Sequence, residues 1–199
     1  MSWRLIAAVC VAALGLERSA SQESARLTFQ AKVSDLLLET GSFARNKRPN
    51  DTVRVTLPGH RIVPPRGVQL IHRADAKWTS PEFAVESIRS ANTVGDAHWI
   101  IEDFAPADQA EVEKLLSDPA VAKRNQDYYK TLSKAEITAL VELRGYTIVF
   151  VREESSQAEV RTVPMTLVKT PAGWKQTNAL SKDETFDVLW AASRNGTMQ

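Results

Sequence analysis

Three histidines, His60, His72 and His98, are the side chains whose chemistry could most directly serve catalysis. None of them pairs with another at the spacing of metal ligands, so the sequence predicts no metal site. Glu102 follows His98 by one helical turn, and a carboxylate in that position can hold one imidazole tautomer for general-base work. The same spacing also describes an ordinary solvated pair on a helix surface. The catalytic residues are therefore left unknown.

Aromatic side chains offer a second kind of chemistry, because small-ligand pockets are lined mainly by aromatic and aliphatic groups. The alternative is that these residues only fill a core, which is their commoner use. Trp99 lies outside the apolar stripe of its predicted helix, so we expect it to cover the N-terminal segment or a partner chain. We predict a ligand pocket formed by His98, Trp99, Phe104, Tyr129, Phe150 and Trp174.

Motifs that would assign a reaction are absent from the sequence. It has no Gly-x-Ser-x-Gly, no phosphate-binding glycine loop and no His-Glu-x-x-His, and it indicates no cofactor. The paired carboxylates Glu102-Asp103 and Glu153-Glu154 are neighbours in sequence, so their side chains point apart and do not form an acid–base dyad by themselves. These observations favour a protein that is not an enzyme, without deciding the question.

The first 21 residues indicate export. A basic start ending at Arg4 precedes an apolar run from Leu5 to Leu16, and small residues follow at 19–21. This is the order of a secretory signal peptide, and the run is too short to span a bilayer as a helix. We expect cleavage after Ser21 and no stable membrane insertion afterwards, although a retained anchor is the alternative. The single cysteine, Cys10, lies in this segment, so the mature chain has no disulfide and suits a bacterial periplasm or exterior.

Composition limits the partners of the mature chain. The formal net charge of the whole sequence is +1, and removing the leader brings it to zero. A nearly neutral chain has no general attraction to nucleic acid, so we expect no nucleic-acid partner. A hydrophobic content of 43% is ordinary for a globular protein of this length.

The front part of the mature chain is rich in short β patterns. Residues 22–40 fit either a strand or a helical stripe, and we expect a helix or a mixed segment. Alternation predicts strands at 52–57, 60–63 and 67–72, separated by Pro58-Gly59 and Pro64-Pro65.

Helix signals replace this pattern after Trp78. Ser80 or Thr79 can cap a first helix with Pro81 at its start, and Asp96 can cap a second. Two more helices are expected at about 108–117 and 119–129.

Period-two alternation returns from Ile137 and predicts strands at 137–143, 146–152, 160–169 and 174–180. The second of these is apolar on both faces and is expected in mid-sheet. Pro164 demands a sheet edge or a bulge, because it cannot donate to a ladder. Ser181 to Glu184 reads as the capping box of a last helix that ends near Asn195.

Over about residues 78–180, the order of helices followed by a strand meander resembles the NTF2-like (SnoaL-like) superfamily. The resemblance is carried by the short sequences at the breaks between elements, which are Ser80-Pro81-Glu82, Gly95-Asp96-Ala97 and Ala172-Gly173-Trp174-Lys175. The resemblance implies an α+β fold in which helices pack into a curved antiparallel sheet as a cone that can stay open as a ligand pocket. The chain then divides into a signal peptide (1–21), a β-rich N-terminal extension (22–77) and an NTF2-like domain (78–199) with an added C-terminal helix.

These expectations favour an exported, non-catalytic binding or interaction module whose partner is a small apolar ligand or an envelope protein. One alternative is an assembly protein that forms a homodimer through the outer face of its sheet. A second is an isomerase- or dehydratase-like enzyme that uses a buried carboxylate or His98.

Overall fold

The computed structural model describes residues 25–38, 41–156 and 160–198. The predicted signal peptide and its cleavage site lie outside the described residues. Across the described ranges, no helix combines the length and the apolar character that crossing a membrane requires.

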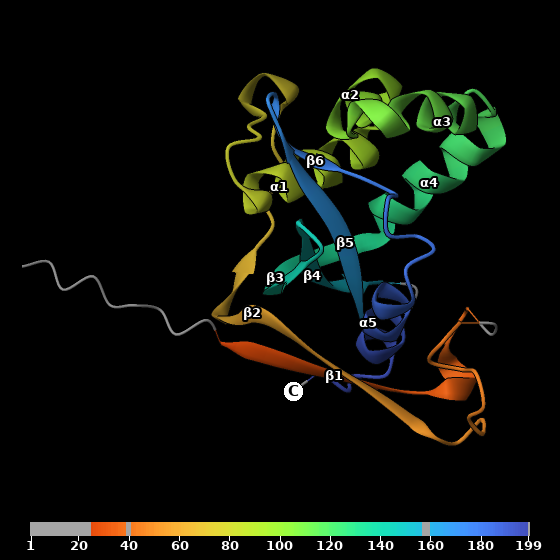
Figure 1. The fold of residues 1–199 in the computed structure, drawn as a ribbon. Coiled ribbons are helices and arrows are strands. Elements are labelled where there is room, and N and C mark those ends of the chain that lie inside the picture. Colours follow the sequence, from red (N-terminus) through yellow and green to blue (C-terminus); the bar gives the residue numbers. More distant parts are fainter. Residues whose placement is uncertain (1–24, 39–40, 157–159, 199) are drawn as a thin grey trace, which may run out of the picture.

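The described chain is an α+β protein built on one antiparallel sheet, in which six strands lie side by side in sequence order (Figure 1). The strands are β1 (Arg26–Lys32), β2 (Thr52–Gly67), β3 (Leu132–Leu143), β4 (Tyr146–Ser155), β5 (Arg161–Thr170) and β6 (Gly173–Gln176). The helices are α1 (Pro81–Val94), α2 (Ala97–Asp103), α3 (Pro106–Leu116), α4 (Pro119–Thr131) and α5 (Glu184–Arg194). Figure 1 shows α1 to α4 gathered at one end of the sheet and α5 at the other, beside β1.

Of the helix or mixed segment expected at 22–40, the described residues form a mixed one, in which the strand β1 is followed by a 3-10 helix at Val33–Asp35. Leu27, Phe29 and Ala31 are buried and alternate with more exposed residues along the strand. β1 pairs with β2 over its whole length, from Arg26 opposite Pro58 to Lys32 opposite Thr52. Two periodicities were compatible with these residues, and the long-range pairing selects the extended one.

β2 is one strand, where three short ones were expected. A Cβ on Gly59 would come within 2.5 Å of the Leu140 carbonyl oxygen, so this glycine allows a close approach to β3 and does not turn the chain. The Pro64-Pro65 pair lies in the register shift between Arg61 and Arg66, where the ladder to β3 is interrupted. The strand expected at 67–72 is wrong, because β2 ends at Gly67.

Capping residues set most helix starts as predicted. The Ser80 hydroxyl accepts a hydrogen bond from the Phe83 N–H at the start of α1, and Asp96 accepts one from the Trp99 N–H at the start of α2. The cap of α5 is Asp183, however, and not Ser181. Glu184 instead accepts a 2.7 Å hydrogen bond from the Ser42 N–H, which ties the loop before β2 to α5.

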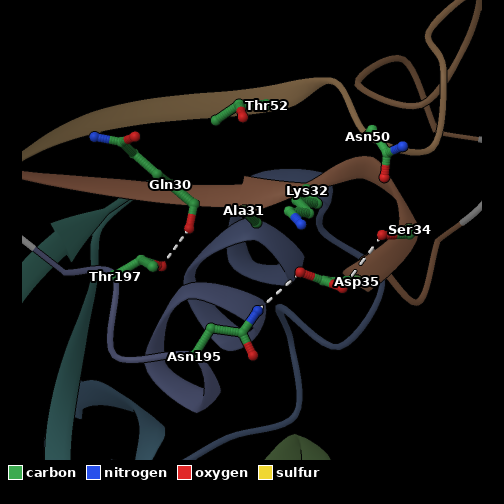
Figure 2. A pocket seen from close by; sticks show the side chains of 9 residues that line it. All are labelled: Gln30, Ala31, Lys32, Ser34, Asp35, Asn50, Thr52, Asn195 and Thr197. Atoms are coloured by element: carbon green, nitrogen blue, oxygen red, sulfur yellow. Dashed lines mark hydrogen bonds between the residues drawn. The ribbon is translucent and has the colours of Figure 1, made fainter.

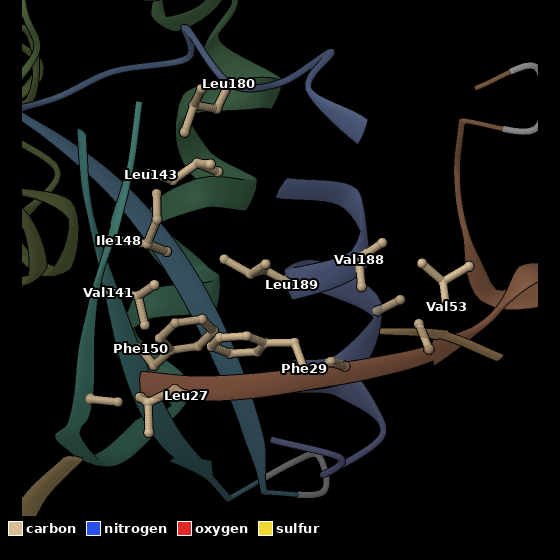
Figure 3. Close-up of a cluster of buried hydrophobic side chains, with 14 of the residues drawn as sticks. Leu27, Phe29, Val53, Val141, Leu143, Ile148, Phe150, Leu180, Val188 and Leu189 are labelled. Atoms are coloured by element: carbon tan, nitrogen blue, oxygen red, sulfur yellow. The ribbon is translucent and has the colours of Figure 1, made fainter. Parts of the chain in front are cut away.

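The first hydrophobic core lies where the sheet curls over itself. Phe29 of β1 and Phe150 of β4 stack with ring centroids 5.3 Å apart, although two strands separate β1 from β4 in the sheet. Figure 3 shows Val188 and Leu189 of α5 beside this stack. Thus α5 fills the space enclosed by β1, β4 and β5.

The second core lies on the opposite face of β4. Ile148 and Phe150 face α5, whereas Val149 and Val151 pack in the cluster that contains Val85 and Ile88 of α1. Helices therefore cover both faces of β4, which confirms its predicted mid-sheet position.

The first half of β5, before Leu167, pairs with β4 on one side and forms a free sheet edge on the other. β6 pairs only with Leu167 to Thr170, and the Thr177 N–H donates to the Thr166 carbonyl just beyond it. Pro164 lies in the unpaired half, as its missing N–H predicted. The expected strand at 174–180 is correct only to Gln176, because the chain then leaves the sheet toward α5.

Candidate functional site

A pocket of about 230 Å³ lies along the free edge of β5, between α4, α5 and the segment after β6. We call it the edge pocket. Its walls combine apolar and aromatic side chains with hydroxyl, amide and carboxylate groups. Its lining residues are Tyr129, Glu153, Val163, Pro164, Met165, Thr166, Gln176, Thr177, Asn178, Ser181, Phe186 and Trp190.

Glu153 is the one charged residue among the described residues of this lining, and it is 6% exposed. Its Oε2 atom accepts hydrogen bonds from the Tyr128 hydroxyl and from Nε of Arg161, the latter at 3.2 Å. The Arg161 guanidinium also lies 4.4 Å from the centre of the Tyr128 ring. Both partners use the same oxygen, so Oε1 has no hydrogen-bond partner among the described residues.

The two tyrosines beside Glu153 stay protonated. Burial raises the pKa of Tyr129 above its ordinary value, and the negative charge of Glu153 raises it further. The pKa of Tyr128 is raised by burial and then by its hydrogen bond to Glu153. At neutral pH both phenols are therefore neutral hydrogen-bonding groups and not bases or nucleophiles.

Other polar groups in the edge pocket are also unpaired within the described ranges. They are the Tyr129 hydroxyl, the Thr166 hydroxyl, the side-chain amides of Gln176 and Asn178, and the indole N–H of Trp190. By contrast, the Thr177 hydroxyl donates to Asp108 at 2.7 Å. The pocket thus offers several donors and acceptors around one carboxylate oxygen.

A larger depression of about 400 Å³ lies beside β1 and the C-terminal segment (Figure 2). Figure 2 shows its polar side chains bonded to one another: Asn195 donates to Asp35 at 2.8 Å, and Thr197 donates to the Gln30 carbonyl at 2.5 Å. Its charged residues, Lys32 and Asp35, are not buried. This surface is less suited to a specific ligand than the edge pocket.

Asp103 forms a separate buried cluster at the end of α2. It is 1% exposed, and Oδ1 accepts hydrogen bonds from Nε1 of Trp78 and from the Ser87 hydroxyl, both at 2.7 Å. Oδ2 is buried and has no hydrogen-bond partner in the described part of the chain. Burial raises the pKa of Asp103 to about 6, against the opposing effects of both hydrogen bonds and of Lys175. Asp103 lines neither the edge pocket nor the depression in Figure 2.

The structure does not gather the six predicted pocket residues around one cavity. Tyr129 lines the edge pocket, but Phe150 is fully buried in the first core and Trp99 is 2% exposed between α1, α2 and α3. Phe104 lies at the end of α2, and Trp174 lines a different depression with Trp78. The expectation that Trp99 covers the N-terminal segment or a partner is wrong, because its indole N–H donates to Ser87 inside the helical cluster.

All three histidines are exposed. The predicted pair of His98 and Glu102 is not formed, because Glu102 instead binds Nη2 of Arg73 at 3.1 Å. His98 lines a shallow depression with Glu113 of α3. Among the described residues, no carboxylate is bonded to the imidazole of His98 to fix its tautomer.

Sequence reasoning missed Glu153, Phe186 and Trp190 as members of one site. A signal for Glu153 was present, since strand alternation places it on the same face as the buried Val149 and Val151. An acid on the buried face of a central strand needs partners or a ligand. Nothing local to the sequence brings Glu153 next to α5, which comes more than 30 residues later.

No group of three or more His, Cys, Asp or Glu side chains that could hold a metal ion occurs in the part of the chain that the structure describes. Comparison with protein-family models, with curated proteins and with solved structures finds no match to this chain.

Proposed function

We propose that this chain is an exported, non-catalytic binding module that holds a small ligand in the edge pocket. The observation that carries this proposal is the meeting of Tyr129, Phe186 and Trp190 with the buried carboxylate of Glu153 in one cavity. Apolar walls with a few convergent polar groups are the usual composition of a ligand site. The volume of about 230 Å³ is below the roughly 300–1,000 Å³ of sites for drug-sized molecules, so a small ligand fits best.

A binding role without catalysis agrees with the chemistry around the pocket. The two tyrosines have raised pKa values and hold their protons, and His98 lies elsewhere on α2. Glu153 is already bonded to Tyr128 and Arg161 through one oxygen. These residues orient and hold a molecule more readily than they move a proton.

Export is the second part of the proposal and rests on residues 1–21. If the order of basic, apolar and small residues acts as a signal peptide, a bacterial host will export the chain and remove this segment. N-terminal sequencing of the exported protein is then expected to begin at Gln22 or within a few residues of it. Recovery of the intact N-terminus on a membrane-bound chain would instead support a retained anchor.

Kinship with the NTF2-like superfamily is a further proposal, limited to residues 78–180. The support is the run of helices before an antiparallel meander and the Gly173 turn that opens β6. The pairing of β1 and β2 with the rest of the sheet and the position of α5 on the opposite face from α1 are departures from a minimal cone.

A proton-transfer enzyme is the second candidate function, because Asp103 is a buried carboxyl group with a pKa raised to about 6. Such an enzyme needs a cavity in which a substrate reaches the carboxyl group. Asp103 is 1% exposed and lines neither pocket described above, so its environment gives this candidate less support.

An assembly protein that dimerises through its sheet has less support still. The outward side of β1 and β2 carries polar groups, such as the Thr28 and Thr56 hydroxyls 3.0 Å apart. On β4, α1 and α5 cover both faces.

The proposed function is tested by screening small molecules for a rise in the melting temperature of the purified protein. A ligand that binds the folded state stabilises it in proportion to the logarithm of its concentration over Kd. We expect hits that lose their effect in Trp190→Ala and keep it in His98→Ala, which changes an exposed residue outside the edge pocket. Hits that are insensitive to Trp190→Ala would place the binding site elsewhere and contradict the proposal.

A further inference from the structure

We infer that the edge pocket selects a small organic ammonium ion, meaning a protonated amine carried on an apolar body. This inference rests on the proposed function, since it names the chemical class of the ligand in the same pocket. Three features of the pocket support it: the charge of its lining, a Glu153 oxygen that accepts no hydrogen bond from the described residues, and the aromatic side chains.

The charge of the lining is the first argument. Among the described residues that line the pocket, Glu153 is the single charged one, and its charge is negative. Arg161 offsets this charge only in part, because it reaches Oε2 through one N–H at 3.2 Å and its side chain is half exposed. A ligand carboxylate or phosphate would face Glu153 directly and be repelled.

The free oxygen is the second argument. Oε1 of Glu153 accepts no hydrogen bond from the described residues, and it is not one of the fully buried unpaired atoms, so it is open to a donor from water or from a ligand. An ammonium group supplies N–H donors and a positive charge together, which gives the stronger, charge-assisted form of hydrogen bond. A neutral apolar ligand would displace water from Oε1 without replacing its hydrogen bonds, and an alcohol would replace them more weakly.

The aromatic walls are the third argument. Trp190 and Phe186 lie on successive turns of α5 with ring centroids 6.4 Å apart, and Tyr129 reaches the pocket from α4. The faces of such rings attract cations, most strongly when water is excluded. The Tyr129 phenol stays neutral, so it adds a hydrogen-bonding oxygen without adding charge. Carboxylate and aromatic rings together therefore favour a cation over any neutral molecule of the same shape.

The test uses three probes of nearly equal size: benzylamine, benzyl alcohol and benzoate. They are titrated separately into the full-length protein at neutral pH, where benzylamine is protonated and benzoate is ionised. We expect benzylamine to bind about tenfold more tightly than benzyl alcohol, the difference between a charge-assisted and a neutral hydrogen bond. Benzoate is expected to bind more weakly than either.

Two carboxylate variants locate the selectivity. Glu153→Gln keeps an acceptor for Tyr128 and removes the charge, so the preference for benzylamine over benzyl alcohol should fall to about one while benzyl alcohol still binds. Glu154→Gln is the matched control, because the adjacent carboxylate bonds Arg152 at 3.1 Å and does not line the pocket. It should leave both affinities unchanged. The melting temperature of each variant checks that it is folded.

The outcomes separate the two proposals. Equal binding of benzylamine and benzyl alcohol, or tighter binding of benzoate, would overturn the cation inference and leave a ligand pocket in place. A benzylamine preference that survives Glu153→Gln would overturn the inference too, because another group would then recognise the amine. If none of the three probes bound at about 10 mM, roughly ten-thousandfold weaker than a ligand with a Kd of about 1 μM, both proposals would fail.

Discussion

Asp103, a carboxylic acid outside the edge pocket, has a pKa that its surroundings raise to about 6. Burial in the helical cluster removes Asp103 from water. Trp78 and Ser87 donate hydrogen bonds to Oδ1, whereas Oδ2 has no donor among the described residues. Lys175 lies close enough to oppose the rise in the pKa of Asp103. Its ammonium group, however, donates a 2.7 Å hydrogen bond to the Glu102 carbonyl and lies over the Trp78 ring. Asp103 therefore links the end of α2 to α1 and to the segment before it, at an electrostatic cost.

Replacement of Asp103 by Asn is expected to change the pH dependence of stability. The folded pKa of about 6 lies above the ordinary 3.8, so the folded state binds this proton more tightly than the unfolded state does. The contribution of Asp103 to the free energy of unfolding is thus present below about pH 4 and is lost as the pH rises to about 6. Relative to wild type, Asp103→Asn should gain up to about 3 kcal/mol between pH 4 and pH 7. Urea unfolding across this range measures the difference.

Asp103→Ala is the companion variant. It leaves the Trp78 indole N–H and the Ser87 hydroxyl without their acceptor, so it should destabilise by about 1–3 kcal/mol relative to Asp103→Asn at every pH. A stability difference between Asp103→Asn and wild type that did not vary with pH would show that Asp103 has an ordinary pKa.

At the scale of elements, two glycines with positive φ angles turn the last strands. Gly145 (φ 83°) follows Arg144 (φ 51°) in the β3–β4 hairpin, and an added Cβ there would meet no atom within 4 Å. Gly173 (φ 100°) begins β6, where an added Cβ would lie 2.4 Å from the Trp78 carbonyl oxygen. That carbonyl accepts a 2.8 Å hydrogen bond from the Trp174 N–H, so β6 and the segment before α1 are held together at this point.

The two glycines give a matched pair of substitutions. Gly145→Ala should cost about 1 kcal/mol, the strain of a side chain in the left-handed region. Gly173→Ala carries the same kind of strain and in addition forces the Trp78 backbone away, so it should cost at least twice as much. Denaturant unfolding of both variants gives the comparison. Equal losses would mean that β6 does not approach Trp78 as closely as the structure shows.

At the scale of the whole molecule, contacts between distant parts of the sequence hold the curl of the open sheet. Phe29 stacks on Phe150, and α5 fills the space beside them with Val188 and Leu189. The Thr197 hydroxyl donates to the Gln30 carbonyl, and Asn195 donates to Asp35, so the C-terminal segment is bonded to the β1 region. One wall of the edge pocket is α5, so the pocket depends on these contacts between α5, β1 and β4.

Phe29→Ala tests whether the stack of Phe29 on Phe150 holds α5 in place. Loss of a fully buried phenylalanine is expected to cost about 3–5 kcal/mol and to increase amide hydrogen exchange in α5, more than 150 residues away in sequence. Thr28→Ala is the control, because the Thr28 side chain points to the opposite face of β1 from Phe29. This substitution should cost less than about 1 kcal/mol. If Phe29→Ala left exchange in α5 unchanged, the stability of α5 would not depend on the stack of Phe29 on Phe150.

Local signals in the sequence determined much of this fold. Ser80 and Asp96 fix helix starts because their side chains accept N–H groups within three residues, and no distant partner is needed. Pro164 fixes a sheet edge because it lacks a donor, whatever lies beside it. The apolar residues on both faces of 146–152 predicted a strand in mid-sheet, and the two cores on either side of β4 confirm this.

The tertiary structure decided what depends on partners far along the chain. Residues 26–32 are a strand because β2 pairs with them, and Gly59 lies within a strand because β3 approaches it closely. The predicted set of pocket aromatics reflected residue type alone, so it included the core residues Phe150 and Trp99 and left out Glu153 and Trp190. A pocket forms only where segments from different parts of the chain leave space between them. The curl of the sheet that brings α5 to the edge of β5 is a property of the packed molecule and of no single segment.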